Sequence, residues 1–227
     1  MSDSFPVPRL SLVKAFLLGA TVTLMAVPWI RRGGMDLWMA VPVAFMAMVL
    51  ISLAAVSWEH RAGMHGVFPE KGRMLIGMGL AGLTVLVLAW ISTFWLDRVF
   101  ESTMRQAGRT DLLALRYPDS PGGQAAKVLW AAGFETMFFQ VGAVSFFSRL
   151  TDRQWLAIVG AVSFRGMVTS MQLSQAGLVD ATWLFIMMSV ATSAVACMLY
   201  VRAGLPAAML FSAVLSLRAP SSLLWMD

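Results

Sequence analysis

Two ionisable side chains lie deep inside consecutive apolar segments of this sequence, Glu135 within residues 127–147 and Arg165 within residues 155–173. An ionisable group in the hydrocarbon zone of a membrane costs roughly 2.5–3.5 kcal/mol on insertion scales, so such residues usually pair or serve a function. Counted from the polar turn near residue 151, Glu135 lies 16 residues before it and Arg165 lies 14 residues after it. With a rise of about 1.5 Å per residue, two antiparallel helices place them at depths of roughly 24 and 21 Å. The spacing therefore predicts an ion pair that joins the two segments.

A membrane-embedded carboxylate of this kind is either part of a catalytic site or a partner for a nearby cation. General acid–base catalysis needs a proton acceptor and neighbouring groups that tune it. No histidine lies within an apolar segment of this chain, and a carboxylate held by a guanidinium is a poor proton acceptor. The residues therefore favour a structural ion pair of Glu135 and Arg165 over a relict catalytic acid. A third interpretation, in which each charge reaches water separately, stays open at this point.

Four runs of sequence carry a resemblance to a known family: FETMFFQ at 134–140, WLAI at 155–158, SF at 163–164 and LPAA at 205–208. Together they resemble the core of the CAAX prenyl protease and bacteriocin-processing (CPBP) family of intramembrane proteases, over roughly residues 125–217. Members of that family are multi-helix membrane proteins, so the resemblance implies a helical membrane core.

The family's first motif is Glu-Glu-x-x-x-Arg, its second is Phe-x-x-x-His, and a later helix adds His with Asn or Asp four residues on. Glu135 matches the first glutamate and Phe164 matches the phenylalanine of the second motif. The positions that depart from the family are Thr136 at the second glutamate, Gln140 at the arginine, Val168 at the histidine, and Ser212 and Ser216 at the third motif. The resemblance thus implies a largely lost active site, with Glu135 as a relict, and a chain that is not an enzyme.

Candidate metal ligands lie in the polar loop after the second apolar segment: His60 and His65, with Glu59 and Glu70. Their spacing matches no established metal-site pattern, and a short polar loop collects such residues in any case. We expect no metal and no cofactor.

The composition identifies the class of protein. Of 227 residues, 59% are hydrophobic and 13% are charged, whereas soluble domains are about 45–50% apolar and about 25% charged. We therefore predict a single integral membrane domain over residues 1–227. The formal charge of +5 fits basic flanks that face anionic membrane lipid. No basic run interleaved with aromatic residues is present, so we expect no nucleic acid partner.

About 20 apolar residues cross the hydrocarbon core of a bilayer, and six clear segments of that kind are present, with a seventh that is doubtful. The segments are residues 10–30, 37–58, 74–96, 127–147, 155–173 and 181–200, with a shorter run at 205–217. The predicted fold is all-α, a polytopic transmembrane bundle of six to seven spans. Three N-terminal spans fill residues 1–96, and the CPBP-like core fills residues 125–227.

Residues 97–124 form the longest stretch without a span. Apolar residues alternate with arginines from Asp97 to Leu115, which is typical of short amphipathic helices at a membrane interface. A turn-rich linker is expected at residues 117–123, because proline and glycine are frequent there. The stretch is therefore predicted to be an interfacial connector.

Lysine and arginine tend to flank membrane segments on the cytoplasmic side. Once the charges of the connector are discounted, their distribution favours the N-terminus and the turn at 149–153 in the cytoplasm. The expected location is the bacterial cytoplasmic (inner) membrane.

Three functions are compatible with these residues. The first is a catalytically degenerate CPBP-like protein that binds membrane lipid and another integral membrane protein, as an assembly factor or a structural subunit of a complex. The second is an active intramembrane protease with an altered site centred on Glu135. The third is a small transporter, which Lys14, Glu135 and Arg165 leave open although ionisable residues are few.

Overall fold

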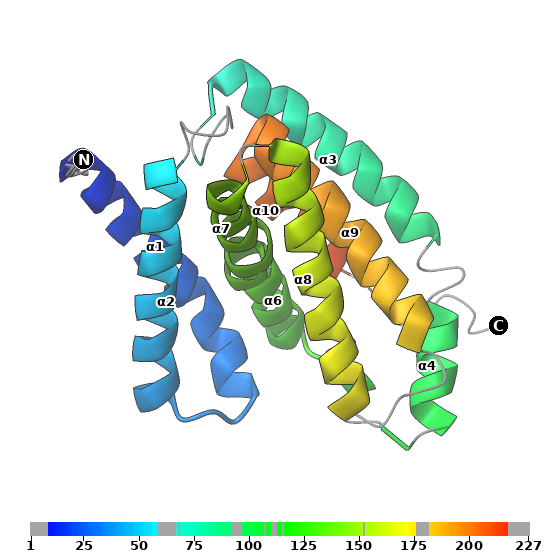
Figure 1. Cartoon of the computed structure of the whole chain (residues 1–227). Helices are drawn as coiled ribbons and strands as arrows, with labels where there is room; N and C mark the ends of the chain where they lie inside the picture. The colour runs from blue at the N-terminus through cyan, green and yellow to red at the C-terminus, as the bar shows by residue number, and fades with distance from the viewer. Residues whose placement is uncertain are drawn as a thin grey trace.

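The chain folds into a bundle of helices in a computed structural model (Figure 1). The residues that the structure describes are 9–58, 67, 69–91, 97–106, 108–109, 113–114, 116–151, 153–175 and 182–217. The helices within them are α1 (Arg9–Arg32), α2 (Leu37–Trp58), α3 (Lys71–Ile91), α4 (Asp97–Gln106), α6 (Pro121–Trp130), η2 (Ala131–Gly142), α7 (Ala143–Leu150), α8 (Gln154–Gln175), α9 (Thr182–Ala203) and α10 (Leu205–Ser216). Six helices are long and apolar enough to cross a membrane, which confirms the predicted polytopic helical bundle and makes the chain an integral membrane protein.

The segments α6, η2 and α7 form one continuous helix, Pro121–Leu150, at the centre of the bundle. In its apolar window 61% of the residues are buried, against 17–33% for the other five candidate spans. The α1–α2 hairpin packs on one side of it, and α8, α9 and α10 pack on the other, with α3 outermost against α9 and α10 (Figure 1). The helix that carries Glu135 is therefore the one that the others surround.

This central helix begins earlier than the sequence predicted. The linker expected at residues 117–123 ends at Ser120, whose hydroxyl accepts a hydrogen bond from the backbone N–H of Gly123 at 3.1 Å and so caps the helix. Pro121 occupies the first helical position, where its missing N–H costs nothing. Proline and glycine thus begin the helix here, and the prediction of a turn through residue 123 was wrong.

Small residues allow the helices to approach closely. A Cβ added at Gly160 of α8 would lie 2.6 Å from the ring of Phe147 of α7. A Cβ at Gly77 of α3 would lie 2.1 Å from the Cβ of Ala203 at the end of α9. Close backbone contact of this kind is a main source of helix association in lipid, where the hydrophobic effect does not act between helices. These contacts hold α8 against α7 and α3 against the end of α9.

The amphipathic connector is present and is held by an ion pair. Helix α4 turns Phe100 and Met104 inward and leaves Arg98 and Arg105 exposed, as the pattern predicted. Asp97, wholly buried at its first residue, contacts Arg116 with 3.2 Å between Oδ1 and Nη2.

We call this pair, with the two rings beside it, the connector clasp. The Arg116 guanidinium lies 4.4 Å from the centre of the Phe100 ring and 5.8 Å from that of Tyr117. Burial raises the pKa of the Tyr117 phenol above its usual value, so the ring stays uncharged at neutral pH. The clasp holds α4 over the adjoining ends of α8 and α9, where Phe100 meets Phe185 edge to face at 5.2 Å.

Helix α10 covers the seventh apolar segment, for which a span was doubtful. Within the described residues it is too short to cross a bilayer. It begins after Gly204, whose φ of 84° reverses the chain at the end of α9, and its 12 residues span about 18 Å. Residues 218–227, the other part of that doubtful segment, lie outside the described residues. The start of α1 and the α7–α8 turn lie at the same end of the bundle (Figure 1).

Candidate functional site: a polar cavity inside the bundle

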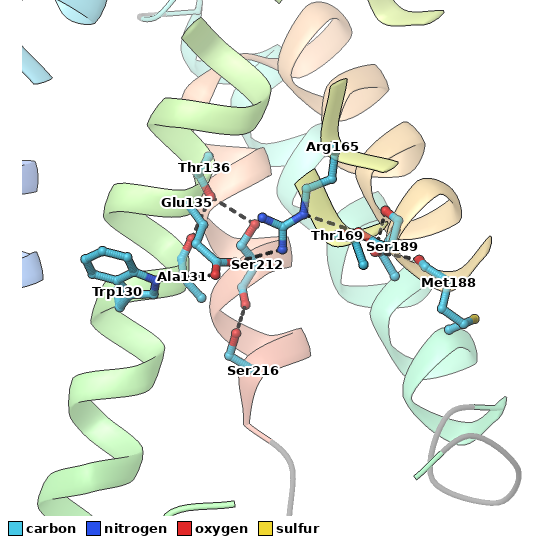
Figure 2. A network of polar contacts seen from close by, with 11 residues as sticks. Trp130, Ala131, Glu135, Thr136, Arg165, Thr169, Met188, Ser189, Ser212 and Ser216 are labelled. Carbon is cyan, nitrogen blue, oxygen red and sulfur yellow. Dashed lines mark hydrogen bonds and ion pairs between the residues drawn. The ribbon is translucent and has the colours of Figure 1, made fainter. Parts of the chain in front are cut away.

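The structure brings Glu135 and Arg165 together. Oε2 of Glu135 lies 3.5 Å from Nη2 of Arg165, which reaches it from α8 (Figure 2). The other carboxylate oxygen accepts a hydrogen bond from the indole N–H of Trp130 at 3.3 Å, and the guanidinium lies 4.0 Å from the centre of the Phe139 ring. The two side chains are 35% and 23% exposed. The pair is therefore only partly enclosed by protein.

Glu135 lies in a stretch of π-helix, Ala131–Gly142, in which backbone hydrogen bonds join residues five apart. The Thr136 hydroxyl follows the same interval and donates to the carbonyl of Ala131 at 2.9 Å. Residues five apart differ by roughly 140° around an α-helix but lie nearly above one another in this wider register. The π-helix thus places Glu135 and Gln140 on one face, a placement that α-helical spacing does not predict.

That face forms one wall of a polar cavity of about 90 Å³ between η2, α8, α9 and α10. Its lining residues are Ala131, Glu135, Gln140, Arg165, Ser189, Thr192, Ser193, Ala196, Phe211, Ser212, Leu215 and Ser216. Hydroxyl groups predominate among the uncharged polar members. A polar cavity of this size is large enough to hold bound water.

Hydroxyl groups on α9 and α10 join the walls of the cavity, and one of them, that of Ser189, holds Arg165. Nε of Arg165 donates to the Ser189 hydroxyl at 3.3 Å, and that hydroxyl lies 2.7 Å from the hydroxyl of Thr169 on α8 (Figure 2). On the opposite wall, the hydroxyls of Thr136 and Ser212 are 2.9 Å apart. These contacts tie all four walls of the cavity together.

Gln140 is the exception among these polar groups. It is 7% exposed, and its side-chain carbonyl oxygen has no hydrogen-bond partner among the residues that the structure describes. A buried amide without a partner costs roughly 1–3 kcal/mol. A group of this kind in a native fold needs an explanation, such as water or a ligand that completes it.

The residues predicted from the family motifs converge on this cavity. Glu135, Gln140, Ser212 and Ser216 line it, and Thr136 contacts Ser212 from behind. Phe164 packs beside the wall, with ring centres 6.1 and 6.0 Å from those of Phe138 and Phe139. Val168 is half-buried one turn beyond Arg165 and does not line the cavity.

The contribution of α9 to the cavity was not predicted from the sequence. Ser189, Thr192 and Ser193 follow the i, i+3, i+4 interval and so lie on one face of that helix. The spacing was a usable signal, but hydroxyls within a membrane helix more often serve contacts between helices.

No group of three histidine, cysteine, aspartate or glutamate residues with metal-binding geometry occurs among the described residues. Glu59, His60 and His65 lie outside that part of the chain, so the structure does not bear on them.

The cavity combines one carboxylate, one guanidinium, one carboxamide and several hydroxyls, so it is charge-balanced and rich in hydrogen-bonding groups. Such an arrangement suits the binding of a small polar group more than it suits proton transfer. In comparisons with protein-family models, curated proteins and solved structures, nothing matches this chain.

Proposed function

We propose that this chain is a non-catalytic membrane protein that binds another integral membrane protein through the polar cavity, as an assembly factor or a standing subunit of a complex. The observation that carries the proposal is the pairing of Glu135 with Arg165 in a cavity whose other described polar groups are hydroxyls and an amide. Polar groups inside a membrane bundle are costly and commonly mark a functional site. A carboxylate paired with a guanidinium leaves the cavity without a net charge.

The resemblance to the CPBP family supports the same proposal. Four of its motif positions, Glu135, Gln140, Ser212 and Ser216, line one cavity although they come from distant parts of the chain. On this proposal the cavity corresponds to the substrate site of an ancestral bacterial intramembrane protease. The site keeps its position in the fold, but other residues replace its catalytic groups. The chain then resides in the cytoplasmic membrane.

Affinity purification in mild detergent tests the proposal directly. A tagged chain expressed from its own promoter should retain a membrane partner at a fixed ratio, because a binding subunit has to form a lasting complex. A cleavage assay on co-expressed transmembrane peptides is run on the same preparation. Cleavage by the wild-type chain that is lost in Glu135→Gln would show an active enzyme and overturn the proposal. A chain that retains no membrane partner would overturn it as well.

The proposal also includes an orientation. Reporter fusions after residue 151 should give a cytoplasmic signal, because lysine and arginine outside the connector favour that side. A periplasmic signal at this position would reverse the orientation.

A further inference from the structure

We infer that the cavity receives an uncharged side chain, a carboxamide or a hydroxyl, from a transmembrane helix of the partner. This inference rests on the proposed function and names the chemistry of the group that the partner supplies. Four properties of the cavity support it: its charge balance, its unpaired hydrogen-bonding groups, its volume and its depth.

Charge balance argues for an uncharged occupant. Glu135 and Arg165 contribute opposite charges to the cavity, and no other ionisable residue is among those that line it. An ammonium or carboxylate group that entered would meet its counter-ion already paired. Burying a charge without a free counter-ion is strongly unfavourable. The site therefore selects against charged groups.

The unpaired groups define what the occupant has to offer. The carbonyl oxygen of the Gln140 amide is buried without a hydrogen-bond partner among the described residues, so it can accept a hydrogen bond from an occupant. Arg165 directs Nε to Ser189 and Nη2 to Glu135, so Nη1 of its guanidinium is available as a further donor. A carboxamide or hydroxyl both donates and accepts hydrogen bonds, and so satisfies both needs at once.

Volume and depth favour a side chain over a lipid headgroup. A volume of about 90 Å³ is smaller than the ~150 Å³ of a cavity known to accept benzene. Glu135 lies 14 residues after the start and 15 before the end of the helix Pro121–Leu150, roughly 21–23 Å from each. Lipid headgroups lie outside a hydrocarbon core about 30 Å thick, whereas a neighbouring helix presents side chains at mid-membrane.

We place the entry of the partner's side chain beside α8. This helix packs along α7 near one end and along α9, but it contacts η2 only lightly. It therefore diverges from the first part of the central helix (Figure 1). Phe138, 36% exposed, contacts Phe164 across the junction of η2 and α8. The partial exposure of Glu135 and Arg165 fits an opening at this junction.

A series of amphiphiles with one tail and four heads tests the chemistry on the purified, partner-free protein. Octanamide should raise the thermal unfolding temperature by about 2–4 °C at a concentration several times its Kd. N,N-dimethyloctanamide, octanoate and octylammonium should raise it by less than half as much. The shift should disappear in Gln140→Met and persist in Ser145→Ala. Equal shifts for all four heads, or a larger shift for a charged head, would overturn the inference.

Ser145 is the matched control because its hydroxyl is also buried without a described partner on the same continuous helix, but it does not line the cavity. A variant at this position reports the effect of removing a buried polar group as such.

Photocrosslinking identifies the source of the group. Benzoylphenylalanine is placed at Phe138 beside the cavity or, as a control, at Phe146, which is 53% exposed on α7. In native membranes Phe138 alone should crosslink to a protein, at an Asn-, Gln-, Ser- or Thr-containing position of a membrane span. Gln140→Met should reduce that yield at least tenfold. Crosslinks to lipid alone at Phe138, or equal protein yields from both positions, would refute a partner helix at this site.

The two proposals fail in different ways. If the wild-type chain purifies with a partner and Gln140→Met retains it equally, the proposed function stands and the cavity is not the contact. If the wild-type chain retains no partner, the proposed function itself fails.

Discussion

The molecule contains two ion pairs of similar chemistry in different surroundings. In the connector clasp, the Asp97 carboxylate is fully buried and lies 3.2 Å from Arg116, whose side chain is 33% exposed and packs near the Phe100 ring. In the cavity, Glu135 and Arg165 are 35% and 23% exposed and 3.5 Å apart. The clasp joins residues 19 apart at the end of the bundle, whereas the cavity pair joins two spans.

This difference in burial suggests different roles: the Asp97–Arg116 pair stabilises the fold, whereas the Glu135–Arg165 pair keeps the cavity electrically neutral. Asp97 is wholly buried, so its charge depends on Arg116 and the other groups around it. The cavity pair has polar neighbours and space for water, so each charge has other sources of solvation. We therefore expect the clasp to contribute more to stability and the cavity pair to contribute more to binding.

The largest loss of stability should come from Arg116→Leu. The substitution leaves a fully buried carboxylate without its guanidinium, and breaking a buried pair in this way typically costs about 3–5 kcal/mol. Thermal unfolding in detergent measures the loss. Arg105→Leu, at an exposed position on α4, the helix that begins at Asp97, should change stability by less than ~0.5 kcal/mol. Similar effects of the two substitutions would mean that the clasp is not a stabilising contact.

A smaller loss, about 1–3 kcal/mol, is expected from Glu135→Leu or Arg165→Leu, because both side chains are partly exposed. Glu135→Leu should be the more damaging, since a lone glutamate can take up a proton and a lone guanidinium cannot lose one. The double substitution should recover much of the loss. The four proteins form a double-mutant cycle, and additive losses would show that the two residues are not coupled.

The smallest change is expected from Gln140→Met and Ser145→Ala in the partner-free protein. Each removes a buried polar group that has no described partner, so stability should be unchanged or rise by up to ~1 kcal/mol. Only Gln140→Met should impair binding. A loss of more than ~2 kcal/mol for Gln140→Met would indicate that the amide makes a structural hydrogen bond in the isolated protein.

Much of the fold follows from the sequence because apolar length and helical rise are simple constraints. The six spans and the contact of Glu135 with Arg165 were expected from residue counts alone. The early start of the central helix was missed because Pro121 and Gly123 are read as turn residues unless the Ser120 cap is recognised.

The shape of the site depends on features that residue types do not encode. The π-helix at 131–142 is a choice of backbone register, and it alone puts Gln140 beside Glu135. The clasp depends on how the connector folds back, which brings Arg116 to Asp97. Amphipathic pattern predicts that such a stretch lies at the interface but not which of its charges meet.

The most direct test of the account is the reactivity of a thiol placed in the cavity. A Ser212→Cys variant is treated with methyl methanethiosulfonate, and the native Cys197, which is buried, serves as the internal control. Because the thiolate is the reactive form, a thiol facing water reacts faster than one buried in an apolar core. The cavity thiol in purified protein should react at least about tenfold faster than Cys197, and its reaction should slow in native membranes, where the partner fills the cavity. A cavity thiol as unreactive as Cys197 in the purified protein, or one equally reactive in both preparations, would contradict the proposal.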